Sequence, residues 1–240
     1  MKPARIKAMV LAAGKGTRLK PFTDSHPKAL FEADGFTLLE HALRHLNHHG
    51  IRDVVINVHH FSDQILEYLD DNGNFGMNIT ISDETAMLME TGGGVRRAEA
   101  FLSDCDAFIV RNVDILSDMD LTAMLRIHLA AKPLATLAVR NRVTSRFFLF
   151  DEAMRLCGWM NRKTGEERIP LPRPHLLPLA FSGIQALSPA VFPLITEKGP
   201  FSLTDLYIRL CPDHVIHGYE DISPYWRDAG KPESTNKESR

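Results

Sequence analysis

The stretch 11–21 reads Leu11-Ala12-Ala13-Gly14-Lys15-Gly16-Thr17-Arg18-Leu19-Lys20-Pro21. Residues 6–12, which run into it, are apolar and predict a buried β-strand. Its small residues let the backbone approach a ligand closely, and successive backbone N–H groups can then bind phosphate oxygens. Lys15 and Arg18 add positive charge that suits phosphate. The stretch therefore predicts a phosphate-binding loop after the first strand.

Two common phosphate-binding motifs do not fit this spacing. A dinucleotide fingerprint needs a third glycine where this chain has Leu19. A P-loop needs lysine and then serine or threonine after its last glycine, whereas Gly16 is followed by Thr17. The structural alternative is a tight strand-to-helix turn without a ligand.

Outward from this loop, the front half of the chain alternates between two hydrophobic patterns. Apolar runs at 6–12, 53–58, 77–82 and 107–113 predict strands, and stretches with helical spacing at 37–49, 62–69 and 92–101 predict helices. Ser62 is the expected N-cap of the second helix. This alternation predicts an α/β fold with a parallel sheet covered by helices on both faces.

The back half is more mixed. Helices are expected at 121–130 and 204–210, a short helix opens at Ser188-Pro189, and strands are expected at 134–140, 147–150, 156–160, 180–187 and 215–219. Residues 161–165 predict a hairpin turn, and the four prolines in 169–178 predict an irregular loop. No linker divides the chain, so we expect a single domain over residues 1–230 and a polar tail over 231–240.

Bulk properties exclude several classes of function. The chain has 240 residues and a net charge of −2, so it carries no overall charge suited to nucleic acid or an anionic membrane. Its three cysteines are far apart, which indicates free thiols rather than a disulfide framework or a zinc site. The sequence shows no signal peptide and no membrane span, which predicts a cytoplasmic protein. The adjacent histidine pairs point apart and predict no metal site.

Three further motifs carry residues suited to phosphate chemistry. Lys28, in His26-Pro27-Lys28-Ala29-Leu30, could face the same phosphates as Arg18 if the loop folds back. Three glycines in Glu90-Thr91-Gly92-Gly93-Gly94 precede a predicted helix and could approach a flat or anionic group. Asp114 ends an apolar strand, where parallel sheets place ligands, and with Asp228 it could bind Mg²⁺. Each motif alone also has a bland explanation, as a surface lysine, a flexible turn or an isolated acid.

Together these motifs resemble the sugar-1-phosphate nucleotidylyltransferases. The family's Gly-x-Gly-Thr-Arg-Leu-x-Pro-x-Thr signature is matched in full by residues 14–23, and its Pro-Lys-x-Leu motif by residues 27–30. The resemblance implies a Rossmann-like nucleotidyltransferase domain with a mixed, mostly parallel central sheet flanked by helices. It also implies that a nucleoside triphosphate and a sugar 1-phosphate give a nucleotide-sugar and pyrophosphate.

The resemblance implies roles for matching residues. Arg18 and Lys28 are expected to be catalytic, and Asp114 and Asp228 to hold Mg²⁺. The residues expected to bind the nucleotide are Leu11, Ala13, Gly14, Lys15, Gly16, Thr17, Gly92 and Gly93, with Gly92 and Gly93 against the nucleobase. Those expected to bind the sugar are Asn112, Ser182 and Gly183.

The chain departs from the family pattern at two places. Val113 stands where the family usually has glycine, and no Glu-Lys-Pro stretch for the sugar phosphate occurs near 161–167, where Lys163 is a weak substitute. The resemblance is to short bacterial members, which include N-acetylmuramate-1-phosphate uridylyltransferase and mannose- or heptose-1-phosphate guanylyltransferases. UTP and N-acetylmuramic acid 1-phosphate are the first expectation, and GTP with mannose or heptose 1-phosphate is the alternative.

Two further alternatives change the class of protein. A choline-phosphate cytidylyltransferase would need an aromatic cage, for which Trp159, Tyr225 and Trp226 are candidates. A non-catalytic nucleotide-sugar sensor would usually have lost the catalytic residues, which are present here. The oligomeric state stays open.

Overall fold

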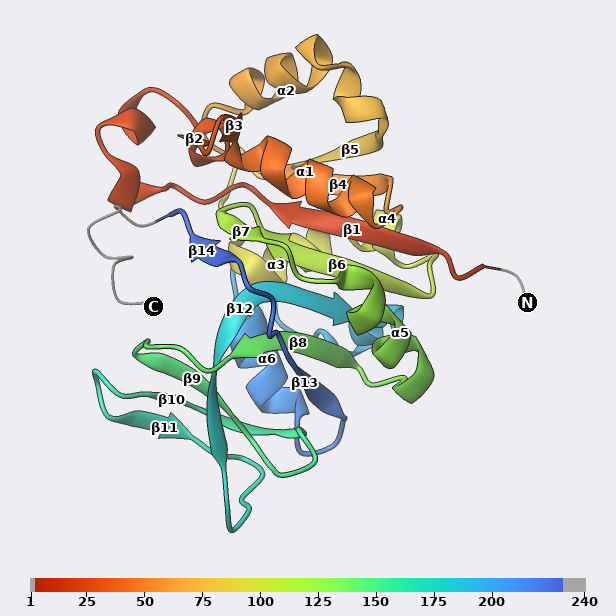
Figure 1. Cartoon of the computed structure of the whole chain (residues 1–240), viewed down its shortest axis with the longest axis vertical. Coiled ribbons are helices and arrows are strands. Elements are labelled where there is room, and N and C mark those ends of the chain that lie inside the picture. Colours follow the sequence, from red (N-terminus) through yellow and green to blue (C-terminus); the bar gives the residue numbers. More distant parts are fainter. Residues whose placement is uncertain (1–2, 231–240) are drawn as a thin grey trace.

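The computed structural model describes residues 3–230. The predicted tail, residues 231–240, lies outside the described residues. A ten-stranded sheet runs through the molecule in the order β11-β10-β9-β12-β6-β1-β4-β5, and β8 pairs with both β12 and β13 (Figure 1). Its strands are β1 (Ile6–Leu11), β4 (Asp53–Val58), β5 (Asn78–Asp83), β6 (Ala107–Asn112), β8 (Ala135–Arg140), β9 (Arg146–Phe150), β10 (Leu156–Asn161), β11 (Glu166–Arg168), β12 (Leu177–Leu187) and β13 (Ile216–Glu220).

Most strands in the central part of the sheet point the same way. β1 is parallel to β4 and β6, and β4 is parallel to β5. β12 is antiparallel to both β6 and β8, so β8 and its parallel partner β13 point in the same direction as β6. The carboxyl ends of these strands therefore share one edge of the sheet, which we call the ligand edge because open parallel sheets bind ligands there. The strands that end at it are β1, β4, β5, β6, β8 and β13. The predicted mixed, mostly parallel sheet is confirmed, and β9, β10 and β11 extend it with antiparallel pairs.

Helices cover both faces of the sheet, as predicted. They are α1 (Leu38–His48), α2 (Ser62–Asp71), α3 (Glu90–Arg97), α4 (Glu99–Leu102), α5 (Leu121–Ala131) and α6 (Leu203–Leu210). Short 3-10 helices are η1 (Thr17–Leu19), η2 (Phe22–Asp24), η3 (Lys28–Leu30), η4 (Gly73–Gly76) and η5 (Pro189–Leu194), and β2 (Glu32–Ala33) pairs with β3 (Phe36–Thr37). None of the helices within residues 3–230 has the length and apolar character needed to cross a membrane.

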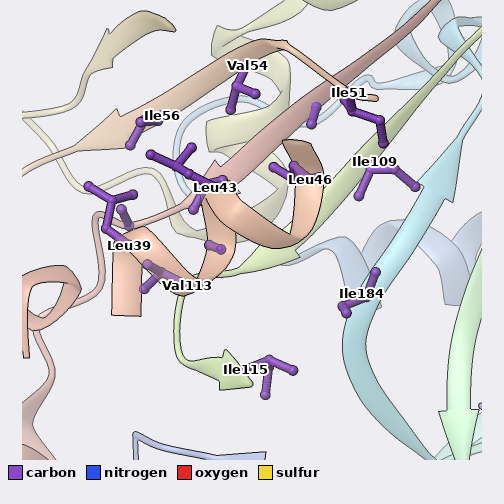
Figure 2. Packing of buried hydrophobic residues seen from close by; sticks show 14 of the residues in the cluster. Leu39, Leu43, Leu46, Ile51, Val54, Ile56, Ile109, Val113, Ile115 and Ile184 are labelled. Atoms are coloured by element: carbon purple, nitrogen blue, oxygen red, sulfur yellow. The ribbon is translucent and has the colours of Figure 1, made fainter. Parts of the chain in front are cut away.

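The alternation of side chains along the buried strands divides the core into two clusters. In β6, Ile109 belongs to the cluster beneath α1, α2 and α5, whereas Phe108 and Val110 belong to the cluster beneath α3, α4 and α6. Figure 2 shows the first cluster, in which Leu43 and Leu46 of α1 lie near side chains of β4 and β6. Strands with apolar residues on both faces need this double cover, which explains their nearly continuous apolar runs.

Three local predictions are wrong. Ser62 is not the N-cap of α2, because Phe61 takes that position with a positive φ of 55°. The predicted helix 92–101 is two helices, α3 and α4, separated at Ala98. The predicted loop 169–178 ends earlier, since β12 begins at Leu177 and includes Pro178, which pairs across to β9. The predicted 161–165 turn is confirmed: the Gly165 N–H donates to the carbonyl of Asn161 at 2.8 Å.

A small two-stranded sheet that the sequence did not indicate lies at the ligand edge. β7 (Ile115–Ser117) pairs antiparallel with β14 (Trp226–Asp228), close to the end of the described chain. Asp228 lies opposite Ile115 in this register. The pairing places the last described segment beside the loop that follows β6.

Candidate active site

The glycine-rich loop is held in place by the neighbouring strand β4. Asn57, near the end of β4, accepts hydrogen bonds through Oδ1 from the N–H groups of Ala12 (2.7 Å) and Ala13 (3.3 Å). Its Nδ2 donates to Oε1 of buried Glu84 at 2.8 Å. Sequence reasoning missed Asn57 and Glu84. The available signal was a polar residue near the end of an otherwise apolar strand.

Gly16 brings the two basic segments together. It has a φ of +60°, and a Cβ atom there would lie 2.8 Å from Cβ of Lys28 and 2.9 Å from Cγ2 of Thr23. A side chain is thus excluded on grounds of both conformation and space. The Thr23 hydroxyl donates to the carbonyl of Gly16 at 3.1 Å. The loop therefore folds back on residues 23–28, which is the condition under which Lys28 and Arg18 could face the same phosphates.

Two aspartates and two cations meet next to this loop. Nζ of Lys28 forms a hydrogen-bonded ion pair with Oδ2 of Asp114, and both side chains are largely buried. The Ala229 N–H donates to the carbonyl of Asp114 at 2.9 Å, which places Asp228 beside Asp114. Nη1 of Arg18 lies 3.9 Å from Oδ2 of Asp228. The structure thus brings together the catalytic and metal residues that the resemblance implied.

The aspartates offer a suitable donor set for a hard divalent cation. Both supply carboxylate oxygens at the ligand edge of the sheet, and Mg²⁺ is usually bound by one or two carboxylates plus substrate phosphates. Across residues 3–230, no group of three or more His, Cys, Asp or Glu side chains is arranged to hold a metal ion by itself. The two aspartates therefore fit a metal that is shared with a bound triphosphate.

Two cavities flank the glycine-rich loop. One, of about 240 Å³, is lined by residues from the loop, β6 and the start of α3, and Leu11, Ala13, Gly14, Lys28, Asn112 and Asp114 are among them. The other, of about 370 Å³, is lined by Lys15, Thr17, Lys20, Thr23, Asp24, His59 and His60. The first suits a nucleoside, since its surface is mainly apolar and it reaches Asp114. The second suits phosphate, since Lys15 and two threonine hydroxyls line it, and its second lysine, Lys20, forms an ion pair with Asp24 at 2.8 Å.

The three glycines do not form a loop before a helix, so that prediction is wrong. They lie within α3, and the N–H groups of Gly92 and Gly93 donate to the carbonyl of Phe201 at 2.8 and 3.2 Å. A Cβ on Gly92 would lie 2.3 Å from the Phe201 ring, and one on Gly93 would lie 2.9 Å from the carbonyl oxygen of Gly199. These glycines pack α3 against the segment before α6. Glu90 and Thr91 line the first cavity instead.

The expected sugar residues are split between two environments. Asn112 lines the first cavity. Ser182 is fully buried, and its carbonyl accepts a hydrogen bond from Nε1 of Trp226 at 2.9 Å. Gly183 has a φ of +82°, and Ile115 fills the space where its side chain would stand. The structure thus gives Gly183 a packing role between β12 and β7.

The aromatic residues proposed for a choline cage have other neighbours. The guanidinium of Arg168 lies over Trp159 at 4.7 Å, and that of Arg142 lies over Trp226 at 4.4 Å. The hydroxyl of Tyr225 donates to Oδ2 of Asp34 at 2.8 Å. Two of the three rings therefore already hold protein cations, which disfavours a quaternary ammonium ligand.

A buried polar network supports the strand that leads to Asp114. Nη1 of Arg111 donates to Nδ1 of His45 at 2.7 Å, and its Nη2 donates to the carbonyl of Ile115 at 2.5 Å. Nε2 of His45 donates to the carbonyl of Met119 at 2.8 Å, and because Nδ1 accepts from Arg111, the imidazole is neutral. Burial lowers the pKa of Arg111 to about 10, and burial followed by the nearby charge of Arg111 lowers the pKa of His45 to about 3.

Known proteins resemble this chain over nearly its whole length. Residues 7–148 match the family model described as nucleotidyl transferase. The chain is 31% identical over 236 residues to an N-acetylmuramate alpha-1-phosphate uridylyltransferase from Caulobacter vibrioides, covering 95% of this chain and 93% of that protein. It is 28% identical to a mannose-1-phosphate guanyltransferase from Yarrowia lipolytica, covering 95% of this chain and 61% of that protein.

The fold is also shared with solved structures. A UDP-glucose pyrophosphorylase from Acinetobacter baumanii superposes with a TM-score of 0.78 at 18% identity, covering 97% of this chain and 91% of that one. At this level of identity the likeness concerns the fold alone, which is the Rossmann-like arrangement expected from the sequence.

Proposed function

Because the chain belongs to the nucleotidyl transferase family and is a sugar-1-phosphate nucleotidyltransferase, we propose that its donor is UTP and its acceptor N-acetylmuramic acid 1-phosphate. The similarity to the Caulobacter uridylyltransferase over 93% of that protein carries this choice of substrates. We place the reaction in the cytoplasm, with Mg²⁺ as the metal.

In the proposed reaction, an oxygen of the sugar phosphate attacks the α-phosphorus of UTP, and the bond to pyrophosphate breaks. Both reactants are anions, so the protein has to position them and neutralise charge. The backbone of residues 13–17 binds the triphosphate, while Lys15 and Arg18 neutralise the departing pyrophosphate. Lys28 neutralises charge near the α-phosphorus. The uracil occupies the first cavity, and Asn112 contacts a sugar hydroxyl.

Asp114 and Asp228 would hold the Mg²⁺ ion, which when bound supplies positive charge to the phosphate oxygens. Asp114 is also the ion-pair partner of Lys28, and Asp228 lies close to Arg18. The protein thereby keeps each cation next to the carboxylate with which it would act. Gly92, Gly93, Ser182 and Gly183 support the site by packing in this proposal, rather than by touching ligands.

The first test removes the negative charge of each aspartate. We expect Asp114→Asn and Asp228→Asn each to lower the rate of pyrophosphate release roughly a hundred- to a thousandfold, the usual effect of losing one strong electrostatic group. Circular dichroism checks that both variants fold. Asp70→Asn, at an exposed position in α2, is the matched control and should keep full activity. Near-normal turnover in both site variants would contradict the assignment.

The GTP alternative is supported by the similarity to a mannose-1-phosphate guanyltransferase over 95% of this chain. A pyrophosphate-release screen decides between the two pairs of substrates. It combines UTP, GTP, CTP and dTTP with N-acetylmuramic acid, N-acetylglucosamine, mannose and heptose 1-phosphates. The highest kcat/KM with GTP and mannose 1-phosphate would replace our substrate proposal.

A further inference from the structure

A third cavity at the ligand edge holds arginines that the reaction above does not use. It has a volume of about 730 Å³ and lies between the segment after β8, strand β9, the start of β12 and the end of β13. β8 and β13 point in the same direction as β6, so this cavity opens on the same edge of the sheet as Asp114. Arg142, Arg162 and Glu220 are its charged lining residues.

Arg142 lies on the side of this cavity next to β14, the strand that carries Asp228. Its Nη2 donates to the carbonyl of Phe181 at 2.9 Å, and its guanidinium lies 4.4 Å from the ring centre of Trp226. Trp226 and Asp228 are two residues apart on β14, so their side chains project from the same face of that strand. Nε of Arg142 is buried and, among the described residues, has no hydrogen-bond partner. An anion that extends from this cavity to the proposed metal site would therefore contact the guanidinium of Arg142.

Arg162 projects from the turn between β10 and β11. Its backbone N–H donates to the carbonyl of Ser145 at 2.7 Å, and its guanidinium lies 4.5 Å from the ring centre of Phe147. This stacking orients an exposed side chain. Within residues 3–230, no hydrogen bond or ion pair engages its guanidinium. Leu177 and Leu179 supply apolar surface in the same cavity.

We infer that this cavity binds the proposed acceptor and selects it by the carboxylate that N-acetylmuramic acid 1-phosphate carries in addition to its 1-phosphate. Arg142 binds the phosphate because it lies beside the strand that carries Asp228. Arg162 binds the carboxylate, for which its planar fork of donors is suited. The apolar side chains contact the arm that carries the carboxylate. This inference rests on the proposed acceptor and assigns a specificity role to a residue of the stretch where this chain lacks the family's Glu-Lys-Pro sequence.

The test compares two acceptors that differ only in a carboxylate-bearing arm, N-acetylmuramic acid 1-phosphate and N-acetylglucosamine 1-phosphate. Arg162→Met keeps an apolar stem over Phe147 and removes the charge. We expect it to raise KM for the first acceptor roughly ten- to a hundredfold, the usual effect of losing a hydrogen bond to a charged group, and to leave KM for the second unchanged. Arg142→Met should raise KM for both, because both carry the phosphate.

Arg146→Met is the matched control, since Arg146 is exposed at the start of β9 and does not line the cavity. It should change neither KM. Two results would overturn the inference while leaving nucleotidyl transfer intact. One is an equal rise in KM for both acceptors in Arg162→Met, and the other is a wild-type enzyme with the same KM for both acceptors.

Calorimetric titration of both acceptors separates this failure from failure of the proposed function. Without pyrophosphate release from any substrate pair, the nucleotidyl-transfer proposal fails by itself. Binding that still depends on the carboxylate and on Arg162 would then support the cavity's assignment. Absence of binding of either acceptor to the wild-type protein would overturn it.

Discussion

Asn57 illustrates how a single side chain holds the glycine-rich loop in place. Its amide bonds two successive N–H groups of the loop on one side and buried Glu84 on the other. Those N–H groups follow the last residue of β1, where strand hydrogen bonds cease. The amide therefore continues the pairing of β1 and β4 into the loop, and fixes the backbone that we propose to bind the phosphates.

We predict that Asn57→Ala destabilises the protein by about 2–3 kcal/mol, because it leaves buried N–H groups without an acceptor. It should also raise KM for the nucleotide, since the loop loses its anchor. Urea unfolding and steady-state kinetics measure the two effects. Asn78→Ala, which removes an exposed bond to Asp53, should cost less than about 0.5 kcal/mol. A stable Asn57→Ala enzyme with normal KM would show that the loop holds its own shape.

At the scale of elements, α3 shows why a glycine run need not indicate a ligand. Its first turns approach the segment before α6 so closely that side chains at Gly92 and Gly93 would overlap Phe201 and the carbonyl of Gly199. The same glycines donate their N–H groups to that segment. Glycine here allows two backbones to come into contact, and Glu90 and Thr91, rather than the glycines, line the first cavity.

We predict that Gly92→Ala destabilises the protein by about 1–3 kcal/mol, as overpacking does in a close-packed interior. The loss should be smaller in a Phe201→Ala background, where the ring that meets the new methyl group is gone, although the Phe201 carbonyl still lies 2.9 Å from it. Urea unfolding of the four proteins in this double-mutant cycle measures the coupling. Unchanged stability with a higher KM for UTP would instead support direct contact with the nucleobase.

At the scale of the whole molecule, the His45–Arg111 network joins helix α1 to the strands that carry the site. It links α1 with β6 and β7 and thereby supports the segment around Asp114. Its geometry requires a neutral imidazole, since Nδ1 must accept a hydrogen bond from a guanidinium. Protonation would place a second positive charge beside Arg111. The fold is therefore expected to respond to acid at this point.

We predict that stability falls as the pH drops from 7.5 to 5. The pKa of His45 is lowered from 6.5 to about 3, so the unfolded chain binds this proton first, and the stabilisation present above pH 6.5 is lost as pH falls. The loss from His45 amounts to about 2 kcal/mol at pH 5. Urea unfolding across this range should give a flatter profile for His45→Gln than for wild type. The exposed control His175→Gln should keep the wild-type slope, and an equally steep profile for His45→Gln would exclude His45 as the cause.

The sequence predicted most of what depends on local pattern. Apolar runs located the buried strands because β6 and its neighbours are covered on both faces, and the spacing at 14–30 indicated the phosphate loop and Lys28. Asn57 was missed because one amide in an apolar strand has no distinctive pattern. The β7–β14 pair was missed because strands of three residues carry too little periodicity to detect.

By itself, the sequence determined the fold class, and it predicted a phosphate-binding loop and two metal-binding aspartates, because each of these is encoded by residues close together or by a matched motif. Only the tertiary structure decided that Asp228 reaches Asp114, that the glycines of α3 pack against Phe201, and that Arg142 and Arg162 line one cavity. These facts depend on strand order, helix approach and register between distant segments. Such features arise from the packing of the whole chain, which no local stretch of sequence specifies.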